Sequence, residues 1–312
     1  MQKKLGTQVK YYIITPTYNR PQELIKSVQS VLDQKERKEI SRNSFDFEII
    51  IINDSPEHDY SAFKQTIDTN LTKIKYFKNE KNMGVNFSRN FALDYIEKNS
   101  IQKNNRLAGS AAFGGAVEIN LEYIIFLDDD DWLAPDALQN ITDIINREVN
   151  RKTNKSTANN IASINWLITN RSLPDNTSMS YIRKENINNF NIEFLLLRKS
   201  FGDVTHTIQK SLALTSRFSK KVKQGEEWIY FSNLNSSTIY KNINTTFSNG
   251  YGNDGLNTYM STQDKKLKIK NLYNLFLEKL KSSSTINSKA IIATYLFLRV
   301  LKTCLQILKF NI

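Results

Sequence analysis

Four short apolar runs, each followed by a polar turn, restrict the possible folds of this chain more than any other feature. They cover residues 11–15, 47–52, 74–77 and 123–127, and each has the length of a strand. The run at 47–52, apolar except for Glu48, is of the kind that a central strand covered on both faces requires. Segments with apolar residues at helical spacing lie between them, beginning with the helix expected after Pro21. This alternation predicts an α/β sandwich with a mostly parallel central sheet.

Polar residues gather where three of these runs end, at Thr15–Asn19, Asn53–Ser55 and Asp128–Asp131. In an open parallel sheet, ligands bind outside the carboxyl ends of the strands. We therefore expect the three turns to meet in one crevice and to form the functional site.

The rest of the chain gives weaker signals. Residues 99–120 are rich in Gly, Ala and Asn, and we interpret them as an inserted surface loop. In the second half we expect strands at 161–169 and 206–210, a short helix at 190–198 and a mobile loop at 248–255.

Charge and cysteine content exclude some classes of protein. The 312 residues include 43 Lys and Arg against 31 Asp and Glu, a formal charge of +12, which favours a polyanion, a nucleotide or an anionic membrane as partner. Cys304 is the only cysteine, and His58 and His206 are the only histidines. A disulfide framework and a metal site built on Cys or His are therefore excluded.

The two ends of the chain bear on localisation. The first six residues carry charge without a following apolar run, and no uncharged apolar run reaches the roughly 20 residues that span a bilayer, so we expect a cytoplasmic protein. Residues from Ser288 onward have the pattern of a basic amphipathic helix. Such a helix either packs on its own domain or lies on the anionic inner face of the plasma membrane as a peripheral contact, and the sequence leaves both open.

The acidic run Asp128–Asp131 needs positive charge nearby, because carboxylates a few ångströms apart repel one another. Mg²⁺ or Mn²⁺ would supply it, often with substrate phosphates as further ligands. A solvated acidic turn before the next helix is the simpler alternative.

Three further residues have both a binding and a structural interpretation. Asp54 can accept hydrogen bonds from a base or ribose, or form an Asx turn. Arg89 can hold a diphosphate or the acidic run, or be an ordinary surface arginine. Tyr18 can lie against a planar base or cover the edge of the core.

Several motifs, in this order, resemble those of family 2 glycosyltransferases of the GT-A fold over about the first 150 residues: Thr15-Pro16-Thr17-Tyr18-Asn19-Arg20, Asn53-Asp54-Ser55, Asn82-Met83-Gly84-Val85 with Arg89-Asn90, and Phe126-Leu127-Asp128-Asp129-Asp130-Asp131-Trp132. The resemblance implies a GT-A sandwich that uses a nucleotide-diphospho-sugar and a divalent cation, Mn²⁺ or Mg²⁺. It also implies inversion at the anomeric carbon.

The resemblance assigns roles to individual residues. Asp54 would contact the nucleobase, Asp128 the nucleotide, and Asp130 the metal; whether Asp129 or Asp131 shares the metal is open. The residues expected to bind the donor are Thr15, Pro16, Tyr18, Arg20, Asp54, Arg89, Asp128 and Asp129.

Gly225-Glu226-Glu227-Trp228 resembles the acidic pair that carries the general base in this family. The resemblance makes Glu227 the base that takes the proton of the acceptor hydroxyl during direct displacement, with Glu226 as the alternative. Both glutamates could instead simply favour the start of a helix.

The interpretation as a whole divides the chain into a GT-A domain at 1–255, with a nucleotide-binding half at 1–131 and an acceptor half at 132–255, and a C-terminal helical extension at 256–312. The expected acceptor is a glycan or a lipid-linked saccharide, as in surface polysaccharide synthesis.

Three other functions compete with this interpretation. A nucleotidyltransferase would also use carboxylates and a metal, but the turn after the first strand contains no glycine. A basic nucleic-acid-binding protein is the second, although an acidic crevice opposes a phosphate backbone, so we expect no nucleic acid partner. A catalytically inactive scaffold is the third.

Overall fold

The structure is a computed structural model. It describes residues 7–34, 44–70, 72–107, 119–153, 164–180, 186–190, 203–221, 227–234 and 236–248, and scattered residues between 267 and 301.

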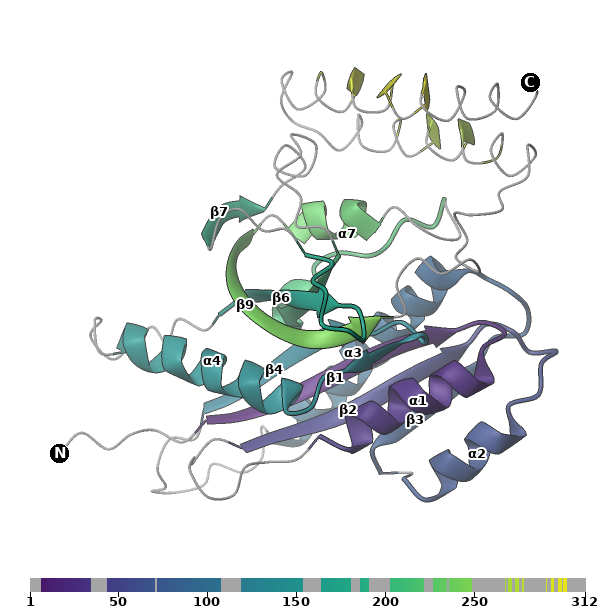
Figure 1. Cartoon of the computed structure of the whole chain (residues 1–312), viewed down its shortest axis with the longest axis horizontal. Coiled ribbons are helices and arrows are strands. Elements are labelled where there is room, and N and C mark those ends of the chain that lie inside the picture. The colour runs from purple at the N-terminus through teal and green to yellow at the C-terminus, as the bar shows by residue number, and fades with distance from the viewer. Residues whose placement is uncertain are drawn as a thin grey trace.

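One curled sheet runs through the molecule (Figure 1). Its first four strands, in the spatial order β3-β2-β1-β4, are parallel, and beyond β4 the strands β8, β6, β9 and β5 continue it with mixed directions. The strands are β1 (Thr7–Thr17), β2 (Ser44–Asn53), β3 (Ile74–Lys78), β4 (Ile119–Phe126), β5 (Asp131–Leu133), β6 (Trp166–Ser172), β7 (Asn186–Phe190), β8 (Val204–Gln209) and β9 (Ser236–Ser248).

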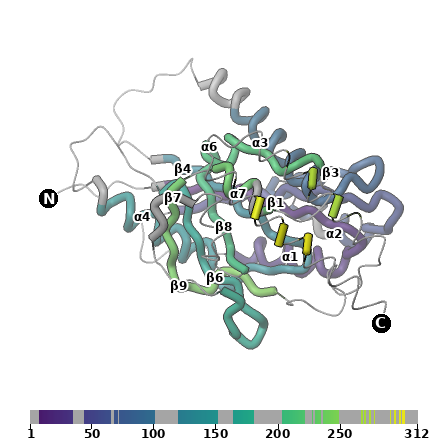
Figure 2. Tube along the Cα trace, turned by 90° about the horizontal axis from the view of Figure 1, so that it is seen from above, coloured from purple at the N-terminus to yellow at the C-terminus, as the bar shows by residue number. Residues whose placement is uncertain are grey.

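Helices cover both faces of the sheet, as the expected α/β sandwich requires. Seen from above, α3 and α6 lie on the opposite side of the sheet from α1 (Figure 2). The helices are α1 (Pro21–Leu32), α2 (Ser61–Asp68), α3 (Val85–Leu107), α4 (Ala137–Thr153), α6 (Lys210–Ala213) and α7 (Glu227–Leu234).

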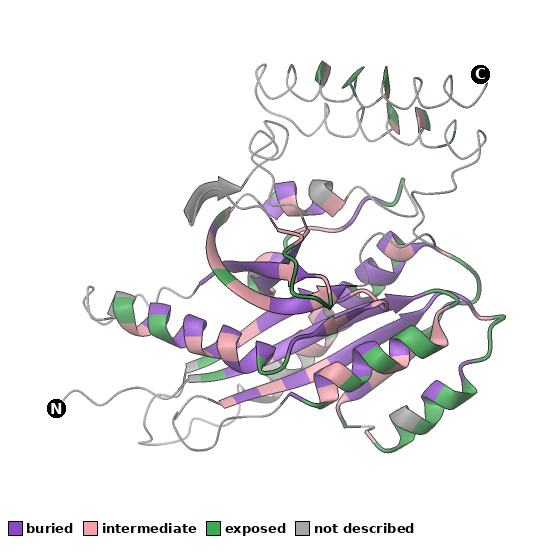
Figure 3. Cartoon of the chain, in the orientation of Figure 1, coloured by how far each residue is buried: buried purple, intermediate pink, exposed green. Residues whose placement is uncertain are grey.

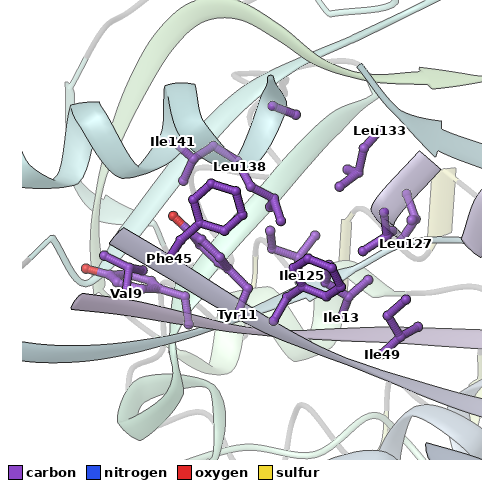
Figure 4. Close-up of a cluster of buried hydrophobic side chains, with 14 of the residues drawn as sticks. Val9, Tyr11, Ile13, Phe45, Ile49, Ile125, Leu127, Leu133, Leu138 and Ile141 are labelled. Atoms are coloured by element: carbon purple, nitrogen blue, oxygen red, sulfur yellow. The ribbon is translucent and has the colours of Figure 1, made fainter. Parts of the chain in front are cut away.

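Side chains of the central strands alternate between two cores, because successive residues of a strand point to opposite faces. Tyr11 and Ile13 of β1 enter the core under α1 and α4, whereas Tyr12 and Ile14 enter the core under α3 and α7. Figure 3 shows this burial along the sheet, and Figure 4 shows part of the first core, where Leu138 of α4 lies over the strands. All four predicted runs form strands, except that Leu127 lies just past the end of β4, and the α/β sandwich with its largely parallel central part is confirmed.

The predicted surface loop over residues 99–120 is wrong at both ends. Helix α3 continues to Leu107, and β4 already includes residues 119 and 120. The side chains of Asn99 and Ser100 donate to the carbonyls of Tyr95 and Ile96, one turn back, so these polar residues continue the helix. The part of the prediction at 108–118 lies outside the described residues.

Several predictions for the second half need correction. The strand expected at 161–169 is β6, which runs later, to Ser172, and Lys210 begins α6 instead of ending a strand. Phe190, expected to begin a helix, ends β7, while 191–198 and the loop at 249–255 lie outside the described residues. The sequence analysis missed β9 altogether, because its Ser, Thr and Asn residues lack an apolar run.

At the C-terminal end, the described residues between 267 and 301 are helical. Apolar side chains that are exposed here include Leu267, Tyr273, Leu277, Phe297, Leu298 and Leu301. Within the described part of the chain, no helix combines the length and apolarity needed to cross a membrane.

Candidate active site

The three predicted polar turns meet at the carboxyl ends of β1, β2 and β4. Thr17 pairs with Asn53 across the sheet, and the backbone N–H of Asp54 donates to the Thr17 carbonyl at 2.9 Å. From the third turn, Asp129 accepts a hydrogen bond from the backbone N–H of Tyr18 at 3.2 Å. The geometric part of the prediction, convergence of the turns, is confirmed.

Tyr60, which precedes α2, ties the first two turns together. Its hydroxyl lies 3.2 Å from the Thr17 hydroxyl and 3.1 Å from the Ser55 hydroxyl. Ser55 in turn accepts a hydrogen bond from the backbone N–H of Asn19, which adopts a positive φ of 57° that Asn tolerates well. This buried hydroxyl cluster fixes the turn that carries Arg20.

Three arginines from three different elements neutralise the acidic run. Arg20, just before α1, donates to Asp129 at 3.3 Å and to Asp130 at 2.5 Å. Arg89 of α3 pairs with Asp128 at 2.8 Å, and Arg171 of β6 pairs with Asp131 at 3.0 Å. The four carboxylates thus already have cationic partners in the protein itself.

Ionisation differs along the run because burial differs. Burial raises the pKa of Asp129 to about 7, and the neighbouring carboxylates Asp130 and Asp128 add to the effect, while Thr17 and Arg20 oppose it. Burial likewise raises the pKa of Asp131 to about 7 although Arg171 opposes it. At Asp128, burial also acts to raise the pKa, but the positive charges of Arg89, Arg171 and Arg20 prevail and hold it below its ordinary value.

Asp54 is buried and receives three hydrogen bonds from one turn. One carboxylate oxygen accepts from the Asn79 amide and from the backbone N–H of Met83, and the other accepts from the backbone N–H of Gly84, all at 2.7 Å. Gly84 has a φ of 91°, a conformation that glycine adopts without cost, and α3 begins at the next residue. Asp54 therefore anchors the entry to the helix that carries Arg89; contact with a base remains a prediction.

Glu227 begins α7 and reaches the acidic run through Arg89. The Arg89 guanidinium donates to Glu227 Oε1 at 3.0 Å from one terminal nitrogen and to Asp128 from the other. Its carbon lies 5.3 Å from the ring centroid of Phe218, which stacks on Tyr230 of α7 at 4.2 Å. Arg89 thus connects Glu227, the predicted base, to Asp128, the residue predicted to bind the nucleotide. Glu226, the alternative base, lies outside the described residues.

Not every predicted donor residue reaches this cluster with its side chain. Thr15 and Pro16 are buried within β1, paired with Ile51 and Ile52 of β2. Tyr18 is 46% exposed and contributes its backbone N–H to Asp129. The donor-binding roles of all three remain predictions.

Asp128 and Asp130 are the more exposed carboxylates of the run, at 39% and 37%, whereas Asp129 and Asp131 are buried. Both pair with an arginine, so exposure does not separate them, and the metal role of Asp130 remains a prediction. Among the described residues, no three His, Cys, Asp or Glu side chains come together to hold a metal ion. A hard cation bound here would therefore take most of its oxygen ligands from substrate phosphates and water, as Mg²⁺ commonly does.

His206 has a structural environment. Its Nδ1 accepts a hydrogen bond from Trp166 Nε1 at 3.1 Å, and its ring stacks on Phe231 with centroids 4.0 Å apart. Burial lowers the pKa of His206 to about 3, and the charge of Arg171 lowers it further. His206 is therefore a neutral side chain that packs against Trp166 of β6 and Phe231 of α7.

Sequence reasoning missed several residues of the site: Thr17, Ser55, Tyr60, Asn79 and Arg171. The first two lie inside the quoted motifs, so their position gave a signal. Arg171 gave none, because it follows two register shifts between β6 and β9 that no sequence pattern marks.

Several known proteins resemble this chain. The model of a protein family described as "Glycosyl transferase family 2" matches residues 12–206. A GalNAc(5)-diNAcBac-PP-undecaprenol beta-1,3-glucosyltransferase of Campylobacter jejuni is 24% identical over 233 residues, which cover 74% of this chain. The match spans 62% of that relative, less than two thirds of its length.

Solved structures share the fold. A crystal structure of residues 1–349 of S. aureus TarS in complex with UDP-GlcNAc superposes with a TM-score of 0.58 and 13% identity, over 92% of this chain and 71% of that one. A longer TarS structure gives a TM-score of 0.56 and 16% identity over 92% of this chain and 43% of that one. The predicted GT-A architecture is confirmed by these neighbours.

Proposed function

The chain belongs to glycosyl transferase family 2, and on that premise we propose that it moves a sugar, with inversion, from a UDP-sugar to a hydroxyl of a lipid-linked or other glycan. As a member of this family it is a glycosyltransferase, which argues against the nucleotidyltransferase and the nucleic-acid-binding protein considered from the sequence. The observation that carries the proposal is the Arg89 bridge, which joins the predicted base Glu227 to Asp128 at the strand ends.

The choice of donor and acceptor draws on the relatives. UDP-GlcNAc is bound in the TarS structure, and the name of the Campylobacter protein gives an undecaprenol-linked acceptor. By analogy with these two proteins, we propose a UDP-sugar as the donor and a lipid-linked saccharide as the acceptor.

In the proposed reaction, the acceptor oxygen bonds to the anomeric carbon as the bond from that carbon to the diphosphate oxygen breaks. Glu227 takes the proton of the acceptor hydroxyl, assistance that is worth about 10²- to 10⁴-fold in such reactions. Asp128 orients the donor side of the site. Asp130 would hold the divalent cation, which when bound acts as a Lewis acid that offsets negative charge on the departing diphosphate.

A peripheral membrane contact follows from the same proposal. The acceptor would then lie in a bilayer, and the exposed side chains of Phe297, Leu298 and Leu301 offer apolar area at the C-terminal end. Basic side chains nearby in the sequence, Arg299 and Lys302, suit anionic lipid headgroups.

A donor screen tests the function. Purified protein is mixed with UDP-, GDP- and dTDP-sugars, with and without Mn²⁺, and both thermal stabilisation and nucleotide release are measured. We expect a UDP-sugar to stabilise the protein and to be turned over, and Glu227→Gln to keep the stabilisation but lose turnover. Stabilisation by no sugar nucleotide would refute the proposal, and unchanged turnover in Glu227→Gln would move the base elsewhere.

A further inference from the structure

Arg89 is a buried arginine that pairs with two carboxylates at once. Its side chain is only 7% exposed, and it makes ion pairs to two carboxylates that lie 39 and 138 residues away in the chain. A buried charge is costly unless its partners and hydrogen bonds are well placed, so such a bridge holds its partners in register. The two partners come from the end of β4 and the start of α7.

The surroundings of Arg89 fix it independently of these partners. Its guanidinium lies over the Phe218 ring, and the backbone of Phe218 is clamped by Asn90, whose amide donates to the carbonyl at 2.9 Å and accepts from the N–H at 2.8 Å. Asn90 follows Arg89 in α3, so one helix carries both the guanidinium and the clamp. Arg89 therefore packs on a ring that its own helix holds in place, and a more exposed carboxylate can be attached to it.

Glu227 is that carboxylate. Its side chain is 38% exposed and lies at the first residue of α7, where it would otherwise move among rotamers. The contact with Arg89 uses Oε1, which assigns Oε2 to the acceptor proton. Without the bridge, the carboxylate would have to be ordered during each turnover, and even about 1 Å of misplacement can cost of the order of 100-fold in rate.

From this geometry we infer that Arg89 is a positioning residue for the general base: it holds Glu227 in its reactive orientation and couples that orientation to Asp128. The inference rests on the proposed function and deepens it. Arginine is required, since its two terminal nitrogens reach separate carboxylates, whereas the single ammonium of lysine is a point charge.

The inference differs from the nucleotide-binding role that the family resemblance gave Arg89. A residue that binds diphosphate in the ground state mainly changes donor affinity, whereas one that orients the base mainly changes kcat. The two roles therefore predict different kinetic results for the same substitution.

Kinetics of Arg89→Lys separate these roles, with UDP release from the UDP-sugar as the rate and calorimetric titration for donor affinity. We expect kcat to fall by about 10-fold or more, up to the 10²- to 10⁴-fold that base catalysis is worth, while donor Kd changes by less than about threefold. In a Glu227→Gln background the same change should cost less than a further twofold or so, because the two residues act as one unit. A large change in Kd with little change in kcat, or losses that add in the double variant, would overturn the inference.

Arg217→Lys is the matched control. Arg217 also joins two carboxylates, Asp94 at 2.8 Å and Glu97 at 2.6 Å, but on the more exposed surface of α3. Its substitution is expected to leave kcat and Kd unchanged.

A measurement without turnover distinguishes failure of this inference from failure of the proposed function. Unfolding free energies of wild type, Arg89→Lys, Glu227→Gln and the double variant give the coupling between the two side chains. Coupling in a protein that turns over no sugar nucleotide would refute the proposed function and, with it, the role of Arg89 in catalysis. Turnover without coupling, and with additive losses in kcat, would refute the inference alone.

Discussion

Acid should destabilise this protein through one histidine in particular. In the folded state, His206 Nδ1 faces the N–H of Trp166, so a proton there would place two donors against each other. Burial is the larger cause that lowers the pKa of His206 to about 3, against an ordinary value of 6.5. Between pH 6.5 and about 3, His206 is therefore protonated in the unfolded chain but neutral in the folded protein. The free energy of unfolding consequently decreases as the pH falls through this range.

The size of the effect follows from this difference. Each unit of pH between the two pKa values is worth about 1.4 kcal/mol, so lowering the pH from 7 to 5 should remove about 2 kcal/mol of unfolding free energy through His206. The same loss results for any folded pKa below about 4, which makes the value insensitive to the depth of burial.

Urea unfolding, followed by circular dichroism between pH 5 and 7, measures this loss when wild type is compared with His206→Gln and His206→Phe. Both variants remove the titrating group, the first keeps an acceptor for Trp166, and the second keeps a ring against Phe231. The stability of wild type relative to either variant should fall by about 2 kcal/mol from pH 7 to pH 5.

The other histidine provides a control. His58→Gln, at the other histidine, should retain the loss in acid because His206 is still present. A difference between wild type and both His206 variants that stays constant from pH 7 to pH 5 would show that the ring accepts a proton in the folded state.

Three further predictions concern the site and the C-terminal end. Asp130→Ala should abolish Mn²⁺-dependent UDP release while the protein still folds; full activity would refute the metal assignment. Asp54→Ala should lower the unfolding free energy by about 3 kcal/mol, because three donors lose their acceptor, against less than about 0.5 kcal/mol for the exposed Asp33→Ala in a urea titration. Phe297→Glu with Leu301→Glu should reduce sedimentation with anionic phospholipid vesicles, and unchanged sedimentation would contradict membrane contact.

The sequence predicts the central part of the fold well, since its signal is local. Residues 49–52 are four consecutive isoleucines, and a strand covered on both faces buries all of them. The polar turn after each run is equally visible, and parallel strands then require the turns to meet. Both inferences use one segment at a time together with a general rule of sheet geometry.

What the sequence could not supply is the pairing of charges across the site. The acidic run indicates that positive charge is needed, but it does not tell which of 43 basic residues provides it. Arg171 reaches Asp131 from a strand whose register shifts immediately before it, and Arg89 reaches Glu227 across 138 residues. Such partners depend on tertiary geometry. The strand β9 was missed for a related reason: it has no apolar run, and the neighbouring strands bury Thr238, Thr245, Thr246 and Ser248.

The matched arginines also affect how any alanine scan of the acidic run must be interpreted. Replacing Asp131 with alanine would leave the mostly buried guanidinium of Arg171 without this carboxylate partner. Replacing Asp128 with alanine would leave Arg89 with one of its two carboxylate partners. Lost activity in either variant could then result from disturbed local structure as readily as from loss of a carboxylate that binds substrate or metal. Double variants, in which a carboxylate and its partner arginine are both replaced by neutral residues, can separate the chemical contribution of each carboxylate from its role as a counterion.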